Sequence, residues 1–338
     1  MTLSSPKPFL SSFIEKFKNL IFSKSFLMLL VLLFPGILIA AFMRARGFVY
    51  TGDSEWYLML ADYSSQGFLA RNPRYAPLYS WCLAFIRFFG FTFKNVQFIY
   101  VCLVFIGFLL AARKYFRSVT LAFLFFILII RNPTVFEIFS HVWTELGYSL
   151  LLFLCGFSLI HMIGNAPKNL FTRYDLLFLC SIALLPLQRY IGGYVAWYLG
   201  CLYLALHYRK PSILSRFTAL FISSVPTVLM LFWNLYISGG IAGEGRDPAI
   251  FTLFENVQFM KRVLVQFFSV EFFLFVFSVI GGIFLIRRKH ISVFWLAVLA
   301  IPIVQLLAQL HSSSIYRFDK INPRFVVVIA PLVIFNAL

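Results

Sequence analysis

An all-α bundle of membrane-spanning helices is the fold class that this 338-residue sequence predicts. Hydrophobic residues make up 61% of the chain and charged residues 12%, whereas a soluble domain is about 45–50% apolar and about 25% charged. The apolar residues are gathered in runs close to the ~20 residues that a helix needs to cross a bilayer. Short basic segments separate these runs, as in polytopic membrane proteins. Together these observations exclude an ordinary soluble domain.

The chain opens with a basic lead over residues 1–25, and the predicted membrane domain covers residues 26–338. Lysines precede the first apolar run, and no small-residue cleavage site follows it. A removed signal peptide carries such a site, so this run is predicted to be a retained anchor with the amino terminus in the cytoplasm. About ten spans are predicted, at residues 26–43, 96–112, 119–131, 144–163, 174–188, 191–207, 217–237, 263–286, 291–310 and 325–338.

The apolar segment 77–90 is not counted as a span. It is short, opens with Pro77 and carries Arg87, features that suit a helix lying flat in the membrane interface. A crossing there would also invert the orientation of every later span. We therefore expect interfacial loop helices between spans one and two.

Basic clusters mark the predicted cytoplasmic side, because short loops rich in Lys and Arg stay inside. They recur after every second span, at 113–117, 168–173, 207–216 and 287–290. The outer side then holds residues 44–95, 131–143, 188–193, 238–262 and 311–324. This pattern predicts a multi-pass protein of the inner (cell) membrane. The last run stops at Leu338 without a polar flank, which is typical of a chain truncated within its final span.

The sequence does not predict nucleic-acid binding, disulfide bonds or a zinc site. The net charge of +17 resembles that of nucleic-acid-binding proteins, but these Lys and Arg residues lie between apolar runs rather than on one water-exposed face. The five cysteines lie inside apolar stretches without paired spacing, so neither a disulfide framework nor a zinc site is predicted.

Charge gathers on the predicted outer side against the positive-inside trend. A charge at membrane depth costs at least ~2.5–3.5 kcal/mol unless it is paired or hydrated. A mixed acidic and basic rim therefore predicts a polar pocket at the outer membrane surface. The residues of this rim are Asp53, Glu55, Asp62, Glu137, Glu145, Glu244, Asp247, Glu255 and Asp319, with Arg74, Arg131, Arg189, Arg246, Arg262, Arg317 and Arg324.

Asp53 is the first candidate for chemistry. It follows the first span in the segment GDSEWY, where a helix is expected to begin. One interpretation is a helix N-cap, because Asp accepts hydrogen bonds from the first free amides of a helix. The other is a general base that accepts a proton from an acceptor hydroxyl or amine. Glu55, two residues later, is a candidate for the same polar pocket.

His141 and Glu145 are the next candidates, at the entry to the fourth span. Their spacing of four places both side chains on one face of a helix. Two ligands are too few for a metal site, so a divalent metal is not favoured and no cofactor is predicted. Glu145 is either a satisfied structural carboxylate or part of the pocket, where it is a catalytic candidate beside Asp53, and His141 is assigned to the pocket.

Three arginines are candidates for an anion site, because a guanidinium pairs with phosphate in a bidentate manner. Arg74 lies in an interfacial turn, and Arg189 and Arg324 lie at the outer ends of apolar spans. The alternative for Arg74 is a structural turn in the membrane interface, and the alternative for Arg324 is an interfacial anchor. A turn made by Pro186 and the glycines after Arg189 does not explain an arginine at that depth. Arg246 and Asp247, in a Gly-rich outer loop, belong either to a solvated turn or to the pocket.

The order of several short motifs resembles a known family. The motifs are GDSEWYLMLA after span one, PLY in the second loop helix, RKYF, NP then TE before span four, LQRYIGG and NPRF. Their order resembles the polytopic membrane glycosyltransferases of the C-type fold, in the bacterial branch of relatives of dolichyl-phosphate-mannose protein mannosyltransferases and aminoarabinose transferases.

This resemblance implies an inverting transfer of a sugar from a polyprenyl-phosphate donor to an acceptor, on the extracytoplasmic face of the membrane. It implies that Asp53 is the catalytic carboxylate, that Glu145 is a second polar residue of the site, and that Arg189 and Arg324 lie near the donor phosphate. The acceptor stays open. Two alternatives from other classes stay open too: a transporter or flippase of lipid-linked saccharides, and a polymerase or ligase of surface polysaccharide.

Overall fold

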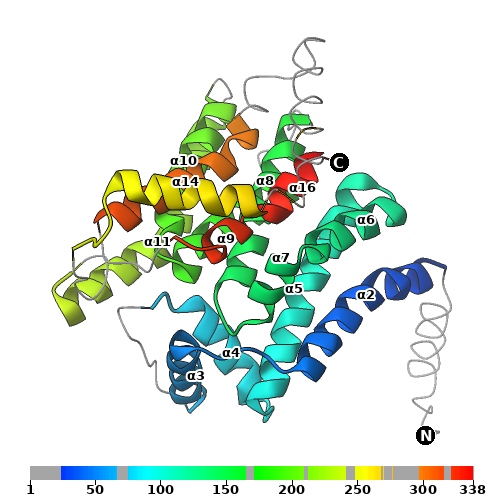
Figure 1. Cartoon of the computed structure of the whole chain (residues 1–338). Helices are drawn as coiled ribbons and strands as arrows, with labels where there is room; N and C mark the ends of the chain where they lie inside the picture. Colours follow the sequence, from blue (N-terminus) through cyan, green and yellow to red (C-terminus); the bar gives the residue numbers. More distant parts are fainter. Residues whose placement is uncertain are drawn as a thin grey trace, which may run out of the picture.

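The computed structural model of the chain describes residues 24–66, 75–164, 171–208, 212–240, 248–267, 269, 276, 297–315 and 321–337. Regular structure within these residues is helical, which confirms the predicted all-α class (Figure 1). An isolated parallel bridge joins Val49 to His141. The helices include α2 (Lys24–Arg46), α3 (Gly52–Ser65), α4 (Leu78–Phe88), α5 (Phe93–Phe116), α6 (Val119–Arg131), α7 (Pro133–Ser140), α8 (Glu145–Gly164), α9 (Arg173–Gln188), α10 (Gly192–His207), α11 (Ile213–Ser238), α14 (Ile301–Ile315), α15 (Arg324–Val327) and α16 (Ala330–Ala337). Residues 253–267 are helical as well.

Three of the described helices, α5, α8 and α11, are long and apolar enough to cross a membrane. A fourth crossing is formed if α6 and α7, which meet at an angle of 81°, count as one broken span. The described residues therefore support a helical bundle with three or four candidate spans, and the prediction of about ten spans is not supported. α9 and α10 have 16 residues each, so at 1.5 Å per residue each is only about 24 Å long. The predicted span 263–286 lies mostly outside the described residues.

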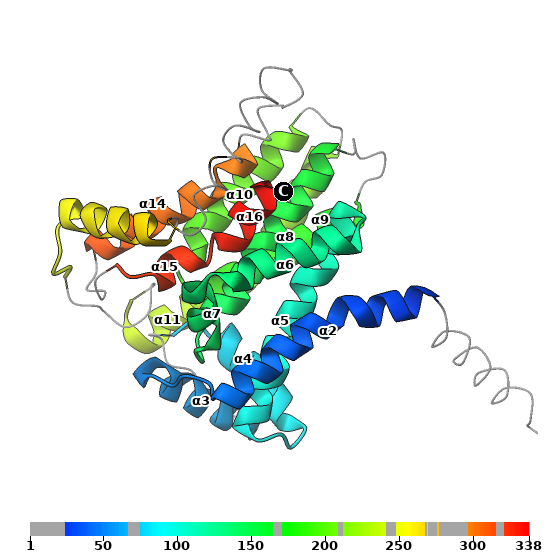
Figure 2. The same cartoon turned by 45° about the vertical axis from the view of Figure 1, so that its right-hand side comes forward.

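Two helices occupy the connection between α2 and α5, as predicted. α3 and α4 lie together at one end of the molecule, the lower end in Figures 1 and 2. α4 has 11 residues and is too short to cross a bilayer. This agrees with the prediction that segment 77–90 does not form a span.

The segment 131–143, predicted as an outer loop, contains helix α7 instead. Pro133 cannot continue α6, because proline lacks a backbone N–H and its ring clashes with the preceding turn. The Asn132 side chain accepts hydrogen bonds from the amides of Thr134 and Val135 and so caps the new helix. An Asn-Pro pair therefore ends one helix and begins the next.

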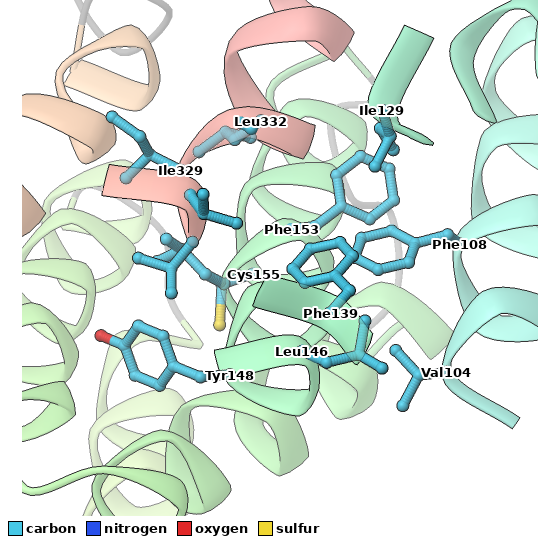
Figure 3. Close-up of a cluster of buried hydrophobic side chains, with 14 of the residues drawn as sticks. Val104, Phe108, Ile129, Phe139, Leu146, Tyr148, Phe153, Cys155, Ile329 and Leu332 are labelled. Atoms are coloured by element: carbon cyan, nitrogen blue, oxygen red, sulfur yellow. The ribbon is translucent and has the colours of Figure 1, made fainter. Parts of the chain in front are cut away.

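The last apolar run, predicted as a span over 325–338, is also different. It is broken into α15 and α16, and residues 325–332 are buried among other helices rather than exposed as a lipid-facing span would be. Leu332 packs so closely on α8 that a side chain at Gly156 would lie 2.7 Å from its methyl group. Figure 3 shows this core, with side chains of α5, α6, α7 and α8 around the C-terminal segment: Val104, Phe108, Ile129, Phe139, Leu146, Phe153, Ile329 and Leu332.

The helices from α8 to α11 give the bundle two chemically different ends. α9 packs along α8, and α10 and α11 both pack against α9. One end carries Glu145 at the start of α8 and Arg189 at the end of α9. The other end carries His161 of α8, which stacks on Tyr174 of α9 at a ring distance of 4.3 Å. Lys114, Arg117 and Arg173 act electrostatically on His161, so basic clusters that are distant in the sequence meet at this second end.

A buried ion pair fastens α9 to α11 at this basic end. Asp175 and Arg216 are both buried, with 3.3 Å between Asp175 Oδ1 and Arg216 Nε. The Tyr203 hydroxyl donates to Asp175 Oδ1 at 2.9 Å, and Thr172 donates to Oδ2. The guanidinium of Arg216 also contacts the Ser212 hydroxyl.

We expect Arg216→Met to lower the free energy of unfolding by about 3–5 kcal/mol, because it leaves the Asp175 carboxylate buried without its cation. Arg117→Met, which removes an exposed arginine at the same end, is the matched control. The measurement is reversible unfolding of the purified protein in mixed micelles. Equal stability of the two variants would contradict a structural role for the pair.

Candidate active site

Helix α3 presents Asp53 at its first turn without using it as a cap. The N-cap of α3 is Thr51, whose hydroxyl accepts a hydrogen bond from the Ser54 amide, while the Ser54 side chain accepts one from the Thr51 amide. This reciprocal pair satisfies the free amides at the start of the helix. The N-cap interpretation of Asp53 is therefore wrong, and its carboxylate is available for other contacts.

Both oxygens of Asp53 contact residues from distant parts of the chain. The Tyr75 hydroxyl donates to Oδ1 at 3.3 Å. The guanidinium of Arg324, in the first turn of α15, donates to Oδ2 through Nη1 and Nη2 at 3.4 and 3.5 Å. These contacts join the first turn of α3 to α15, in the last described segment of the chain.

Glu145 lies one step further into the protein. Its Oε1 atom is 3.2 Å from Nε of Arg324 and 3.1 Å from Nη1 of Arg189. The four residues Asp53, Glu145, Arg189 and Arg324 thus form one connected set of ion pairs, which we call the charge cluster. Its formal charges cancel, so each charge is paired, as charges shielded from bulk water require.

Solvent exposure rises outward through the charge cluster. The side chain of Glu145 is 2% exposed, that of Arg189 13%, that of Arg324 21% and that of Asp53 37%. Glu145, predicted as a catalytic residue, is buried and contacts both arginines. Asp53 lies at the open edge, where a bound molecule has access to it.

The ring of Trp143 packs against the guanidinium of Arg324. The guanidinium carbon of Arg324 lies 4.6 Å from the centre of the Trp143 ring, within the range of a cation–π contact. The indole Nε1 donates to the Thr51 hydroxyl at 2.8 Å. Thr51, which caps α3, therefore also holds the Trp143 ring that supports Arg324, and this couples the position of α3 to that of Arg324.

His141 does not share a helical face with Glu145, so that prediction is wrong. α8 begins only at Glu145, and His141 lies in extended backbone at the end of α7. Its ring stacks on Trp143 at 4.1 Å, and its Nδ1 atom lies 2.8 Å from the Glu137 carbonyl oxygen. Among the described residues, no group of three or more His, Cys, Asp or Glu side chains is arranged to hold a metal ion.

A row of four tyrosines in edge-to-face contact, which we call the tyrosine ladder, leads from the charge cluster into the bundle. Tyr75 packs edge-on against Tyr57, Tyr57 against Tyr79, and Tyr79 against Tyr100, with ring centres 5.0 to 5.2 Å apart. The rings come from α3, α4 and α5 and the turn before α4, so the ladder locks the loop helices to the bundle. Burial raises the pKa of the Tyr57 phenol, so this group stays neutral beside the charges. Gln188 closes the ladder and donates to the carbonyl of Thr144 at 3.0 Å, next to Glu145.

The structure does not bring every predicted site residue into the charge cluster. Glu55 is exposed on α3, and its side chain is not among the contacts of the charge cluster. Arg74, Arg246 and Asp247 lie outside the described residues. The structure thus brings together Asp53, Glu145, Arg189 and Arg324 of the predicted set.

Sequence reasoning missed three residues that complete the site: Tyr75, Trp143 and Thr51. The chain contains 16 Tyr and 6 Trp, most of which suit core or interface positions, so composition singled out none of them. Their places in the sequence were the available clue, because both lie beside residues that were already candidates for the site. Tyr75 follows Arg74, and Trp143 lies between His141 and Glu145. Thr51 was identifiable from the Thr-x-x-Ser spacing, which favours a cap at position 51 over position 53.

Comparisons with models of known protein families, with curated proteins and with solved structures found no match for this chain. The resemblance to C-type glycosyltransferases therefore stays a prediction. The charge cluster itself combines two chemical capacities: a partly exposed carboxylate can accept a proton, and two guanidinium groups beside it can hold an anion.

Proposed function

We propose that the protein is a membrane glycosyltransferase that moves a sugar from a polyprenyl-phosphate donor to an acceptor, with Asp53 as the general base. The observation that carries this proposal is that Arg324 is shared between the exposed Asp53 and the buried Glu145. A base and an anion-binding cation therefore lie within one contact distance at the open edge of the charge cluster.

The proposed reaction needs both groups. The acceptor O–H or N–H gives its proton to Asp53, and its lone pair forms the new bond to the anomeric carbon of the sugar. The bond from that carbon to the phosphate oxygen breaks with inversion, and its electron pair leaves on the polyprenyl phosphate. This leaving group is an anion, so catalysis needs a cation to stabilise it rather than an acid to protonate it.

Arg324 is built to supply that cation. Its Nε faces Glu145, which fixes the stem of the guanidinium, while Nη1 and Nη2 face Asp53 at the edge. A donor phosphate competes with Asp53 for the two Nη groups. Binding of the donor thus draws Arg324 toward the phosphate and frees Oδ2 of Asp53 to accept a proton. Arg189, which also contacts Glu145, adds a second positive charge near the phosphate.

The proposed setting is a multi-pass bundle in the inner (cell) membrane, with the charge cluster on the extracytoplasmic face. Support comes from the two ends of the bundle: Lys114, Arg117 and Arg173 gather at one end, and the charge cluster lies at the other. Basic clusters of this kind stay on the cytoplasmic side. In this proposal the short helices α9 and α10 also cross, since α9 packs along the candidate span α8.

The two ends of α5 test this orientation. After the five native cysteines are replaced, we expect Thr92→Cys to react with a membrane-impermeant thiol reagent added to intact cells, and Lys114→Cys to react only after the membrane is opened. Both positions are exposed and lie at opposite ends of one helix. Labelling of both from outside would contradict the proposed orientation.

A deletion strain tests the function in the cell. We expect loss of the protein to cause accumulation of one polyprenyl-phosphate sugar, detected by mass spectrometry of extracted lipids, because its consumer is missing. Expression of the wild-type chain should remove the accumulated lipid, and the Asp53→Asn chain should not. Accumulation confined to the cytoplasmic leaflet would instead favour a flippase, and accumulation of a lipid-linked oligosaccharide would favour a polymerase or ligase.

A further inference from the structure

Tyr75 contacts the proposed base on the side opposite Arg324. Its hydroxyl donates to Oδ1 of Asp53, whereas Arg324 holds Oδ2. The Asp53 side chain is 37% exposed, so these two contacts restrict a carboxylate that solvent would otherwise leave free to rotate. Only one of the two partners is also required elsewhere in the proposed reaction, since Arg324 moves toward the donor phosphate.

Tyr75 itself is held from several directions. Its ring lies nearly parallel to that of Trp56, with centres 6.2 Å apart, and meets Tyr57 edge-on at 5.2 Å. Its carbonyl oxygen accepts a hydrogen bond from the Tyr190 hydroxyl at 3.2 Å. That hydroxyl in turn accepts one from the side chain of Asn234, which is buried on α11, at 3.5 Å. The Tyr75 hydroxyl is therefore placed by α3, by the turn between α9 and α10, and by α11.

We infer that Tyr75 is a positioning residue for Asp53, an inference that rests on the proposed function. When the donor phosphate takes Arg324, Tyr75 keeps Oδ1 in place, so Oδ2 stays directed at the acceptor. The role is positional because the Tyr75 hydroxyl neither loses nor gains a proton in the reaction. Reacting groups held in the correct geometry gain rate in the chemical step without a change in donor affinity.

The test is Tyr75→Phe, which removes the hydroxyl and keeps the ring packing on Trp56 and Tyr57. With the polyprenyl-phosphate sugar that the wild-type protein turns over, we expect kcat to fall about tenfold while KM for the donor is unchanged, the pattern of a contact that matters in the transition state. Tyr63→Phe is the matched control, since Tyr63 is an exposed tyrosine of α3 away from the charge cluster. Its kinetics should equal those of the wild type.

A double substitution separates positioning from a general structural effect. If Tyr75 acts through Asp53, adding Tyr75→Phe to Asp53→Asn should cause no further loss of kcat, because the group that it positions is already inactive. Tyr190→Phe is a second test of the positioning role. Loss of its hydrogen bond to the Tyr75 carbonyl should lower kcat in the same way, by a smaller factor. Affinity for polyprenyl phosphate alone should stay at the wild-type value in Tyr75→Phe and Tyr190→Phe, because neither substitution touches Arg324.

The outcomes distinguish this inference from the proposed function. Wild-type kcat in Tyr75→Phe, together with a large loss in Asp53→Asn, overturns the positioning role and leaves Asp53 as the base. A tenfold loss that adds fully to the loss in Asp53→Asn also overturns it. Near-normal turnover by Asp53→Asn overturns both proposals.

Discussion

Asp53→Asn is expected to lower the turnover of sugar transfer by about 10²–10⁴-fold, the usual range for loss of a general base. The amide keeps the shape of the side chain and one carbonyl oxygen, so the contact with Arg324 can be retained. It cannot accept the acceptor proton at neutral pH. The N-cap of α3 is supplied by Thr51, so the substitution should not affect insertion or folding. The measurement is turnover of the purified variant, with its stability checked by thermal unfolding.

Glu55→Gln is the control for this prediction. Glu55 is exposed on the same helix, two residues from Asp53, and its charge is removed in the same chemical way. We expect near wild-type turnover from it. A folded Asp53→Asn protein with near-normal sugar transfer would show that the base is another group, and Glu145 would be the poorer substitute because it is buried.

Arg324→Ala is expected to lower kcat by about 10²–10³-fold, comparable to removal of one donor that stabilises charge in a transition state. The loss has two parts: the leaving phosphate loses its cation, and Glu145 loses one of its two arginines. Arg324→Lys should restore only part of the rate and should weaken use of the lipid donor, because a bidentate fork becomes a point charge. The measurement is the dependence of rate on donor concentration.

Arg87→Ala is the matched control for Arg324→Ala. Arg87 lies at the same end of the molecule, on α4, and also pairs with a carboxylate, Asp62, at 2.7 Å. It is outside the charge cluster, so its loss should leave the donor dependence unchanged. If Arg189→Ala and Arg324→Ala both behave like Arg87→Ala, the donor phosphate does not bind at the charge cluster.

Much of the site followed from charge patterning along the sequence. Alternation of basic loops placed Asp53, Glu145, Arg189 and Arg324 on one side of the bundle, although the first and last are separated by 271 positions. The apolar runs also located α5, α8, α9 and α11 to within a few residues of their bounds. Hydropathy and charge act over whole helices, so a pattern that repeats over many residues predicts them well.

Contacts between individual side chains could not be predicted in the same way. The spacing of His141 and Glu145 indicated a shared helical face, but the start of α8 falls between them and removes the helical geometry on which that argument depended. Similarly, residues 325–332 are as apolar as a span, yet they pack inside the protein. Hydrophobicity alone does not distinguish burial in lipid from burial in protein, so an apolar run of this length is not sufficient evidence for a span.

The most direct test of the proposed function is sugar transfer by the purified protein in lipid vesicles. The vesicles carry synthetic polyprenyl-phosphate hexoses and pentoses, with an extract of cell-envelope lipids and glycans as the source of acceptor. We expect release of free polyprenyl phosphate and a product whose anomeric configuration is opposite to that of the donor, both absent with Asp53→Asn. Movement of intact lipid-linked sugar between leaflets, without release of polyprenyl phosphate, would contradict a transferase and would indicate a transporter.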